Sequence, residues 1–303
     1  MPHPQSSTLC YNKIMTFEDV ETARKAYYDK FKKYLLISLL LVILACFSVL
    51  ISGPILAGPL IIIAIATGLI VASVMTSKQK IAYKKAYKGY FIEQTLNKIF
   101  TVLSYSHEQG FSSAVIRESG MVTLADRFYS NDLTIAKYKK IAFAQADVGI
   151  SQTRTDDKGN TYEIPIFKGR YMVFEFPKKF DYKLEVVGKK FHAFKIASGK
   201  MKKLETESTD FNHHFKIFGE DGFESFYLLD PAVIAKIEDL AVHYDYKLLL
   251  GFYDHKLIVA LDDGKDSFEP PSFMRPIDEK AEMKKVQTDI KVITDFVDII
   301  SSH

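Results

Sequence analysis

Residues 34–52 read YLLISLLLVILACFSVLIS, and residues 60–75 read LIIIAIATGLIVASVM. Neither stretch contains a charged residue, over nineteen and sixteen positions respectively. An apolar helix of about 20 residues crosses the hydrocarbon core of a bilayer, which is about 30 Å thick. The segment between them, SGPILAGP at residues 52–59, holds two prolines and two glycines, which end a helix and let the chain reverse. The sequence therefore predicts a transmembrane helical hairpin.

Two helices buried in a soluble core are the alternative to this hairpin. Such helices usually keep a polar or charged face where they meet solvent, and neither stretch has one. The membrane interpretation is therefore favoured.

Basic residues lie beside both apolar stretches, and basic flanks stay on the cytoplasmic side of a membrane. We therefore expect an inner (plasma) membrane protein with both termini in the cytoplasm and only the Gly-Pro loop outside. The flanking cations also suit contact with anionic lipid headgroups. The residues expected to make that contact are Arg24, Lys25, Lys32, Lys33, Lys78, Lys80, Lys84 and Lys85.

The rest of the chain is acidic. The chain has 40 basic and 37 acidic residues, of which the flanks at 24–33 and 78–88 hold ten and one, so that 30 basic and 36 acidic residues remain. Binding of nucleic acid needs a basic face on the folded domain. Nucleic acid is therefore not expected as a partner.

Small residues recur every fourth position in the second apolar stretch, at Ala64, Gly68 and Ala72. Such a stripe lets another helix approach closely. The first apolar stretch, which is tethered beside it, is the favoured partner, and an oligomer through the hairpin stays open.

Cys10 lies in the polar N-terminal segment and Cys46 lies within the first apolar stretch, so the two are not expected to form a disulfide. This fits a reducing cytoplasm. ILAC at 43–46 has the form of a lipoprotein cleavage box. Against that alternative, more than thirty residues precede the apolar run, and the run continues past Cys46. A cleavable secretory signal is disfavoured for the same reasons.

The segments around the hairpin read as follows. Residues 1–15 show no periodicity and are expected to be mobile. Thr16 begins a capping-box-like start with acids in the first turn. The return helix has no proline between residues 76 and 103. Residues 16–103 are thus predicted to form the hairpin and a helical stalk.

Residues 104–275 are predicted to form a cytoplasmic α+β domain, with a break near 190–210 that would separate two subunits. A short helix from Ser112 to Ser119 ends at Gly120. Alternating apolar residues predict an antiparallel meander with strands at 141–150, 162–166, 170–176 and 183–187, with a turn at 156–160.

A second group of elements follows. A strand is expected at 214–218, and Asp230 and Pro231 predict the start of a helix that reaches about His243. Strands at 246–252 and 257–261 around Asp254-His255 predict a hairpin. Apolar residues with heptad spacing predict a helix over 276–303, which docks on the stalk or the sheet rather than forming a free coiled coil. The fold class is therefore α+β, with a mixed antiparallel sheet and helices behind the membrane hairpin.

Five blocks of sequence resemble a bacterial family of two-pass membrane proteins that is catalogued only as a domain of unknown function. They begin at Gly110-Phe111, Asp126-Arg127-Phe128, Phe167-Lys168-Gly169, Phe211-Asn212-His213 and Asp266-Ser267-Phe268. The resemblance extends from the stalk to the last helix. It implies the architecture above and supplies no catalytic residue.

Motifs for familiar chemistry are missing from the sequence. It contains neither a Walker phosphate loop nor a dinucleotide-binding glycine motif, and no zinc-protease or hydrolase signature. His213 and His214 would point to opposite faces of a strand, which disfavours a shared metal. Residues 156–160 lack the acids of a calcium loop. No catalytic residue, cofactor or metal ligand is therefore assigned.

The acidic segment 262–271 is the most distinctive exposed candidate, although such a segment is more often only a solvated connection. Its carboxylates, which would dock a basic partner or a cation, are Asp262, Asp263, Asp266 and Glu269.

The sequence thus favours a membrane-tethered cytoplasmic module that binds an unknown protein partner or acts as a scaffold. An enzyme of unfamiliar type acting on a membrane-associated substrate is one alternative, and a sensor of anionic lipid surfaces is another. Transport is disfavoured because neither apolar stretch carries a charge.

Overall fold

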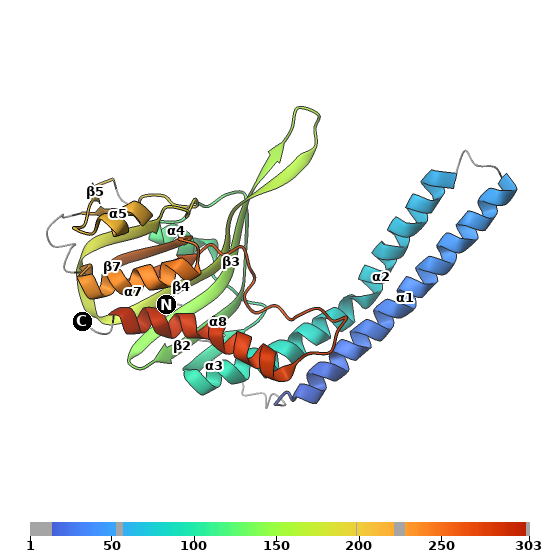
Figure 1. Ribbon diagram of the computed structural model, residues 1–303, viewed down its shortest axis with the longest axis horizontal. Coiled ribbons are helices and arrows are strands. Elements are labelled where there is room, and N and C mark those ends of the chain that lie inside the picture. Colours follow the sequence, from blue (N-terminus) through green and yellow to red (C-terminus); the bar gives the residue numbers. More distant parts are fainter. Residues whose placement is uncertain (1–13, 53–56, 198, 221–227, 301–303) are drawn as a thin grey trace. The chain divides into compact units, whose positions relative to one another are not determined.

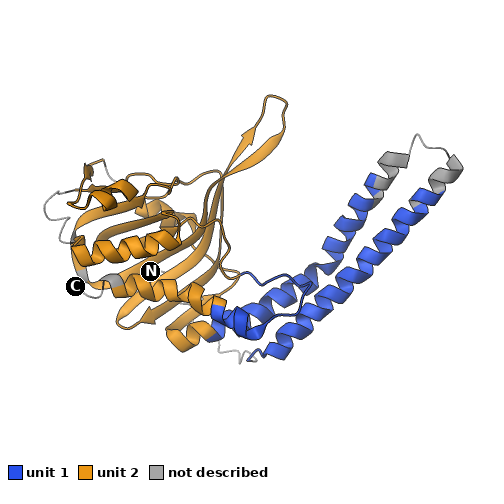
Figure 2. Ribbon diagram, viewed as in Figure 1, with its two compact units in different colours: residues 1–94, 269–284 blue, residues 95–268, 285–303 orange. Residues whose placement is uncertain are grey.

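The computed structural model describes residues 14–52, 57–197, 199–220 and 228–300. The chain divides into two compact units (Figure 2): residues 1–94 with 269–284, and residues 95–268 with 285–303. The first unit is helical, and the second is built on a seven-stranded sheet. The expected α+β class with an antiparallel sheet is confirmed. Residues 1–13 of the segment expected to be mobile, which include Cys10, and residues 53–56 of the Gly-Pro loop lie outside the described residues.

Two long helices, α1 (Phe17–Ser52) and α2 (Ala57–Tyr87), lie side by side in the first unit (Figure 1). The predicted capping box starts α1. The Asp19 N–H donates to Thr16 Oγ1 at 3.2 Å, and the Thr16 N–H donates to Asp19 Oδ2 at 2.9 Å. These bonds satisfy backbone donors that a helix start leaves unpaired.

The helical stalk ends earlier than predicted. After Tyr87 the helix widens into a π-helix, η2 (Lys88–Glu93), and continues as α3 (Gln94–Ile99). Residues 101–106 then form strand β1 (Thr101–Ser106), so the expectation of helix to Leu103 is wrong. The β-branched and aromatic residues of TVLSYS favour a strand, and pairing with β2 provides the partner.

The two predicted helices of the hairpin are present, but the structure does not support their predicted membrane-spanning character. Counted over the described residues alone, no helix is both long enough and apolar enough to cross a membrane.

All strand pairs of the second unit are antiparallel, in the order β1-β2-β3-β4-β6-β5, with β7 also paired to β4. The remaining strands are β2 (Arg127–Tyr138), β3 (Ile141–Thr155), β4 (Thr161–Gly188), β5 (Lys202–Leu204), β6 (Phe215–Gly219) and β7 (Leu248–Leu261). The strand β4 is central, since β3, β6 and β7 all bond to it.

Two strands are longer than predicted. The expected strands at 162–166, 170–176 and 183–187 are parts of the one strand β4. The expected hairpin at 246–261 is also wrong, because β7 is a single strand that pairs with β4 from Leu261 to Leu249. Asp254 has a φ of 49° and lies where the register shifts, so the polar pair Asp254-His255 marks an irregularity within a strand rather than a turn.

Helices cover both faces of this sheet. Helix α4 (Ser113–Ser119) ends at Gly120 with a φ of 70°, as its sequence predicts. Ile116 of α4 packs in one core with Tyr171, whereas the neighbouring Arg170 bonds to Asp289 of α8 (Glu279–Ile300). Successive strand residues point to opposite faces. Helices α4 and α8 therefore lie on opposite faces of the sheet.

Helix α7 (Pro231–His243) lies beside α8 (Figure 1), and Lys236 Nζ donates to the Asp298 carbonyl at 3.5 Å. As predicted, Pro231 is the first helical residue, and the Asp230 carboxylate accepts from the N–H groups of Ala232 and Val233. The buried residues of α8 within the second unit are Val286, Ile290, Ile293, Phe296 and Val297.

Candidate functional site

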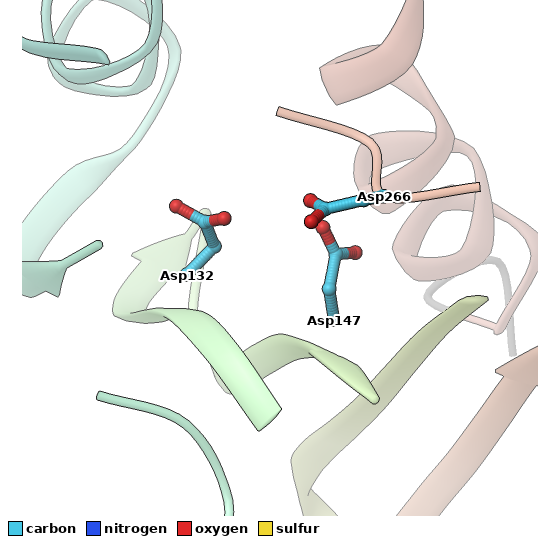
Figure 3. Close-up of side chains that lie close together, drawn as sticks. All are labelled: Asp132, Asp147 and Asp266. Carbon is cyan, nitrogen blue, oxygen red and sulfur yellow. The ribbon is translucent and has the colours of Figure 1, made fainter. Parts of the chain in front are cut away.

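Three aspartates from distant parts of the sequence converge in the second unit (Figure 3). Asp132 comes from β2, Asp147 from β3, and Asp266 from the segment between β7 and α8. One carboxylate oxygen of each lies within 4.8 Å of the others. Among the described residues, this is the one group of three or more histidine, cysteine or acidic side chains arranged in this way. We call it the aspartate cluster.

Asp132 reaches the cluster through an irregularity in β2. The register with β3 shifts between Asn131 and Thr134, and Asp132 has a φ of 59°. Its side chain is buried, with 1% exposed. The Tyr105 hydroxyl donates to Asp132 Oδ1 at 3.0 Å, and Asn131 Nδ2 donates to Oδ2 at 2.8 Å. These donors orient the carboxylate.

Asp147 lies on the next strand and is 5% exposed. Its Oδ2 accepts the Ser267 N–H at 2.9 Å, a bond that ties the segment after β7 to the sheet. Burial raises the pKa of Asp147 well above its usual range, Arg170 opposes that shift, and the neighbouring Asp266 carboxyl reinforces it. The Asp147–Asp266 pair therefore resists carrying two negative charges.

Arg170 is the cation beside the cluster. It is the register partner of Asp147 on β4 and is itself buried. Its Nη1 donates to the Asp289 carbonyl at 2.6 Å, and its guanidinium lies 5.4 Å from the Phe268 ring centroid. These contacts hold the guanidinium in place next to Asp147.

The acidic segment singled out in the sequence does not act as one surface. Asp266 joins the cluster, whereas Asp262 Oδ1 accepts the Lys168 N–H at 3.0 Å and Asp263 Oδ1 accepts the Lys265 N–H at 3.0 Å. Glu269 belongs to the first unit, where it pairs with Lys84 at 2.5 Å and Lys88 at 3.5 Å. Each of these carboxylates therefore has an internal contact.

The basic residues expected at the membrane surface divide into two sets. Arg24 is buried; its guanidinium bonds to Glu21 at 2.8 Å and to the Phe273 carbonyl at 2.8 Å, and Lys84 is partly buried against Glu269. These two cations hold the first unit together. The exposed set comprises Lys25, Lys32, Lys33, Lys78, Lys80 and Lys85.

The small residues of α2 lie where the two helices meet. A Cβ atom on Gly68 would come within 2.4 Å of Ser38 Cβ on α1, and Ala72 is buried. The side chain of Ala64 lies outside the described residues. Where the stripe is described, it permits close approach of the neighbouring helix.

His213 and His214 are not on a strand, contrary to the prediction. They end helix α5 (Thr209–His214), whose first turn is capped by Ser208 accepting the Phe211 N–H. The His214 ring stacks on Tyr246 with 4.5 Å between centroids. The ring therefore has a packing role.

Sequence reasoning singled out Asp266 but missed Asp132 and Asp147. A signal for Asp147 was present, since Gln145 and Asp147 place two polar residues on one face of the otherwise apolar stretch 141–150. Asp132 gave no comparable signal, because only the bulge in β2 turns it toward Asp147.

Residues 165–301 match the family model described as protein of unknown function, DUF3137. The resemblance to a family catalogued only as a domain of unknown function is therefore confirmed. The matched residues include Arg170 and Asp266, whereas Asp132 and Asp147 precede them.

The search of curated proteins gave no match. Among solved structures, the chain is similar to the crystal structure of the mycobacterial trehalose monomycolate transport factor A, TtfA, at 8% identity and a TM-score of 0.37. The similarity covers 72% of this chain and 95% of that chain. A likeness this weak supports no conclusion about function.

Proposed function

We propose that the hairpin of α1 and α2 inserts into the inner membrane and holds the α+β unit at the cytoplasmic face, where it binds a protein partner. The observation that carries this proposal is the exposure of the hairpin's apolar side chains. On α1 these are Leu35, Leu36, Ile37, Leu39, Leu40, Leu41, Ile43, Leu44 and Phe47; on α2 they are Ile62, Ile63, Ile65, Leu69, Ile70, Val71, Val74 and Met75.

The distribution of these side chains favours lipid over a protein as the occupant. Successive helix residues are rotated by about 100°, so the consecutive positions 35, 36 and 37 face three different directions. A docked protein would need one apolar stripe, whereas lipid surrounds a helix. The uncharged length of residues 34–52 suits the same environment.

The charges at the base of the hairpin fit the same placement. Exposed lysines flank the apolar part of both helices, and they would meet anionic headgroups on the cytoplasmic side. This contact rests on Lys25, Lys32, Lys33, Lys78, Lys80 and Lys85, without Arg24 and Lys84.

The partner-binding part of the proposal rests on the sheet edge. Strand β1 is at one end of the strand order, and Leu103 on it is exposed. An edge strand offers unpaired backbone groups to an extended peptide. A photo-crosslinking residue at Leu103 should give a product of defined mass in membranes, and the same residue at the exposed Val242 of α7 should not. Equal crosslinking at Leu103 and Val242 would contradict partner binding at strand β1.

Fractionation of a bacterial host tests the tether. The full chain should sediment with membranes and resist a carbonate wash, and Ile43→Lys with Ile65→Lys should release it, because each buried lysine costs about 2.5–3.5 kcal/mol. Leu103→Lys with Val242→Lys, at exposed sites of the second unit, is the matched control and should stay in the pellet.

Wild-type protein that remains folded in the supernatant after ultracentrifugation would refute the tether. Its orientation is tested separately by a tag after His303, which should be protected from protease added to intact cells.

A further inference from the structure

We propose that the aspartate cluster binds one oxygen-preferring divalent cation, Ca²⁺, Mg²⁺ or Mn²⁺, with Asp132, Asp147 and Asp266 as carboxylate ligands and Gln145 Oε1 as a further oxygen. This inference is independent of the membrane tether, since all four residues belong to the second unit.

The spacing of the carboxylates suits a single ion. Hard cations take oxygen ligands at about 2.0–2.6 Å, so oxygens on opposite sides of one ion are about 4–5 Å apart. The three aspartates present oxygens that all lie within 4.8 Å of one another. In Figure 3 the carboxylates of Asp147 and Asp266 lie close together, and one oxygen of Asp132 points toward that pair.

Unpaired buried oxygens beside the cluster provide a second observation. Gln145 Oε1 and Thr134 Oγ1 have no hydrogen-bond partner, although these residues are 1% and 0% exposed, and Asp266 Oδ1 is also buried and unpaired. A buried acceptor without a donor costs about 1–3 kcal/mol. A cation would satisfy several such acceptors at once.

The strand register brings these oxygens to the cluster's side of the sheet. Gln145 and Asp147 are two residues apart on β3, so their side chains share a face. Thr134 is the register partner of Gln145, in the pair that follows the bulge holding Asp132. Tyr105 is in turn paired with Thr134 and reaches Asp132 with its hydroxyl. This row therefore borders the carboxylates.

The charge balance favours a cation as well. Three carboxylates face one guanidinium, that of Arg170, which also bonds to the Asp289 carbonyl. Arg170 carries one positive charge, whereas the three carboxylates carry three negative charges when all of them are ionised. Buried carboxylates in this situation coordinate a metal or take up a proton.

Terbium luminescence tests the site in full-length protein purified in detergent and dialysed against chelator. The chain has no tryptophan, so sensitised emission must come from tyrosine, and the Tyr105 hydroxyl is 3.0 Å from Asp132 Oδ1. We expect saturable Tb³⁺ emission that Ca²⁺ or Mn²⁺ displaces, and a rise in Tm with the displacing ion.

Variants separate this site from surface carboxylates. Asp147→Asn and the less buried Asp266→Asn should each weaken binding at least tenfold, and Gln145→Leu at least threefold. Asp262→Asn is the matched control, because an asparagine oxygen can still accept the Lys168 N–H, and its affinity should be unchanged.

Three results would overturn the proposal. One is the lack of saturable emission and of any Tm rise with Ca²⁺, Mg²⁺ and Mn²⁺. Another is equal binding by the wild type and by folded Asp147→Asn and Asp266→Asn, which would place the ion elsewhere. Unchanged affinity in Gln145→Leu would remove Gln145 from the ligand set. None of these results bears on membrane insertion, so the two proposals fail separately.

Discussion

The helical hairpin and the sheet unit place their side chains in opposite ways. In the apolar parts of α1 and α2, the described large side chains are exposed, as at Phe47, which is 65% exposed. Around the sheet most of the large apolar residues are buried, and so are several charged groups, among them Asp132, Asp147, Arg170 and Glu185. Large exposed apolar patches on a protein usually mark a site of interaction, whereas a buried apolar core is the ordinary arrangement.

At the base of the hairpin, buried apolar side chains give way to exposed ones. The ring of Phe273 packs against Tyr27 at 4.0 Å and Phe31 at 5.3 Å between centroids, and Tyr83 donates to the Pro271 carbonyl at 3.1 Å. This packing is of the ordinary globular kind, with apolar groups inside. The exposed apolar surface begins beyond it, at residue 35.

The largest expected effect is a difference in stability between two Phe→Ala variants, one in each region. Phe174→Ala, in the sheet core at 0% exposed, should destabilise the second unit by about 3–5 kcal/mol, because it loses transfer energy and leaves a cavity. Phe47→Ala on α1 should leave the unfolding midpoint in detergent unchanged. Urea denaturation followed by circular dichroism measures both, and equal losses would break the comparison.

Removal of the buried Arg170 side chain should reduce stability by a similar amount. Arg170→Ala leaves the aspartate cluster without its compensating charge, which we expect to destabilise chelated protein by about 3–5 kcal/mol. Adding Asp147→Asn should recover part of that loss. Lys190→Ala, which breaks a surface pair with Asp245, is the control and should have no measurable effect. A loss that Asp147→Asn does not reduce would mean that Arg170 acts through packing alone.

The buried Glu185 makes stability depend on pH. Burial raises its pKa from 4.5 to about 7. The hydrogen bond that Glu185 accepts from the Ala197 N–H and the charge of Lys183 both lower the pKa, but by less. The folded chain thus binds this proton more tightly than the unfolded chain, and the free energy of unfolding falls as pH rises from about 4.5 to 7.

The contribution of Glu185 across that range is about 3 kcal/mol, from the difference between its ordinary pKa and the pKa of about 7 in the folded chain. Glu185→Gln should therefore be more stable than the wild type at pH 8 and similar at pH 4. Urea titrations at the two values measure the difference, and a wild-type advantage at pH 8 would contradict the assignment.

The smallest effect is expected at a helix start. Asp230→Ala removes the cap that accepts two N–H groups of α7 and should cost about 1 kcal/mol. Asp230→Asn keeps an acceptor and should recover most of it. Thermal unfolding of both variants measures this, and a loss shared by Asp230→Asn would point to the charge rather than the cap.

Features with a local cause could be predicted from the sequence. The cap at Asp230, the glycine end of α4 and the capping box at Thr16 each depend on a few neighbouring residues, and each is present. Predictions that depended on distant partners failed. Asp254-His255 has turn chemistry, but the long partner β4 keeps the chain in one strand. Likewise the sequence predicts residues 101–103 as the end of the stalk helix, because the partner strand β2 is not visible locally.

The aspartate cluster likewise contains one residue that the sequence singles out and two that it does not. Asp266 stood out because acids are conspicuous in a short polar segment, whereas Asp132 and Asp147 are single acids within strands. Their convergence depends on the β2 bulge and on the segment after β7, which Ser267 ties to Asp147.

The sequence by itself determined the apolar hairpin, its basic flanks, the α+β class and the capped helices, because hydropathy and capping act over a few residues. Only the tertiary structure decided which acids meet, which lysines stay exposed and how far each strand extends. Those outcomes depend on contacts between residues far apart in the chain, as between Asp132 and Asp266, and pairing energy gained across the sheet outweighs local turn preferences.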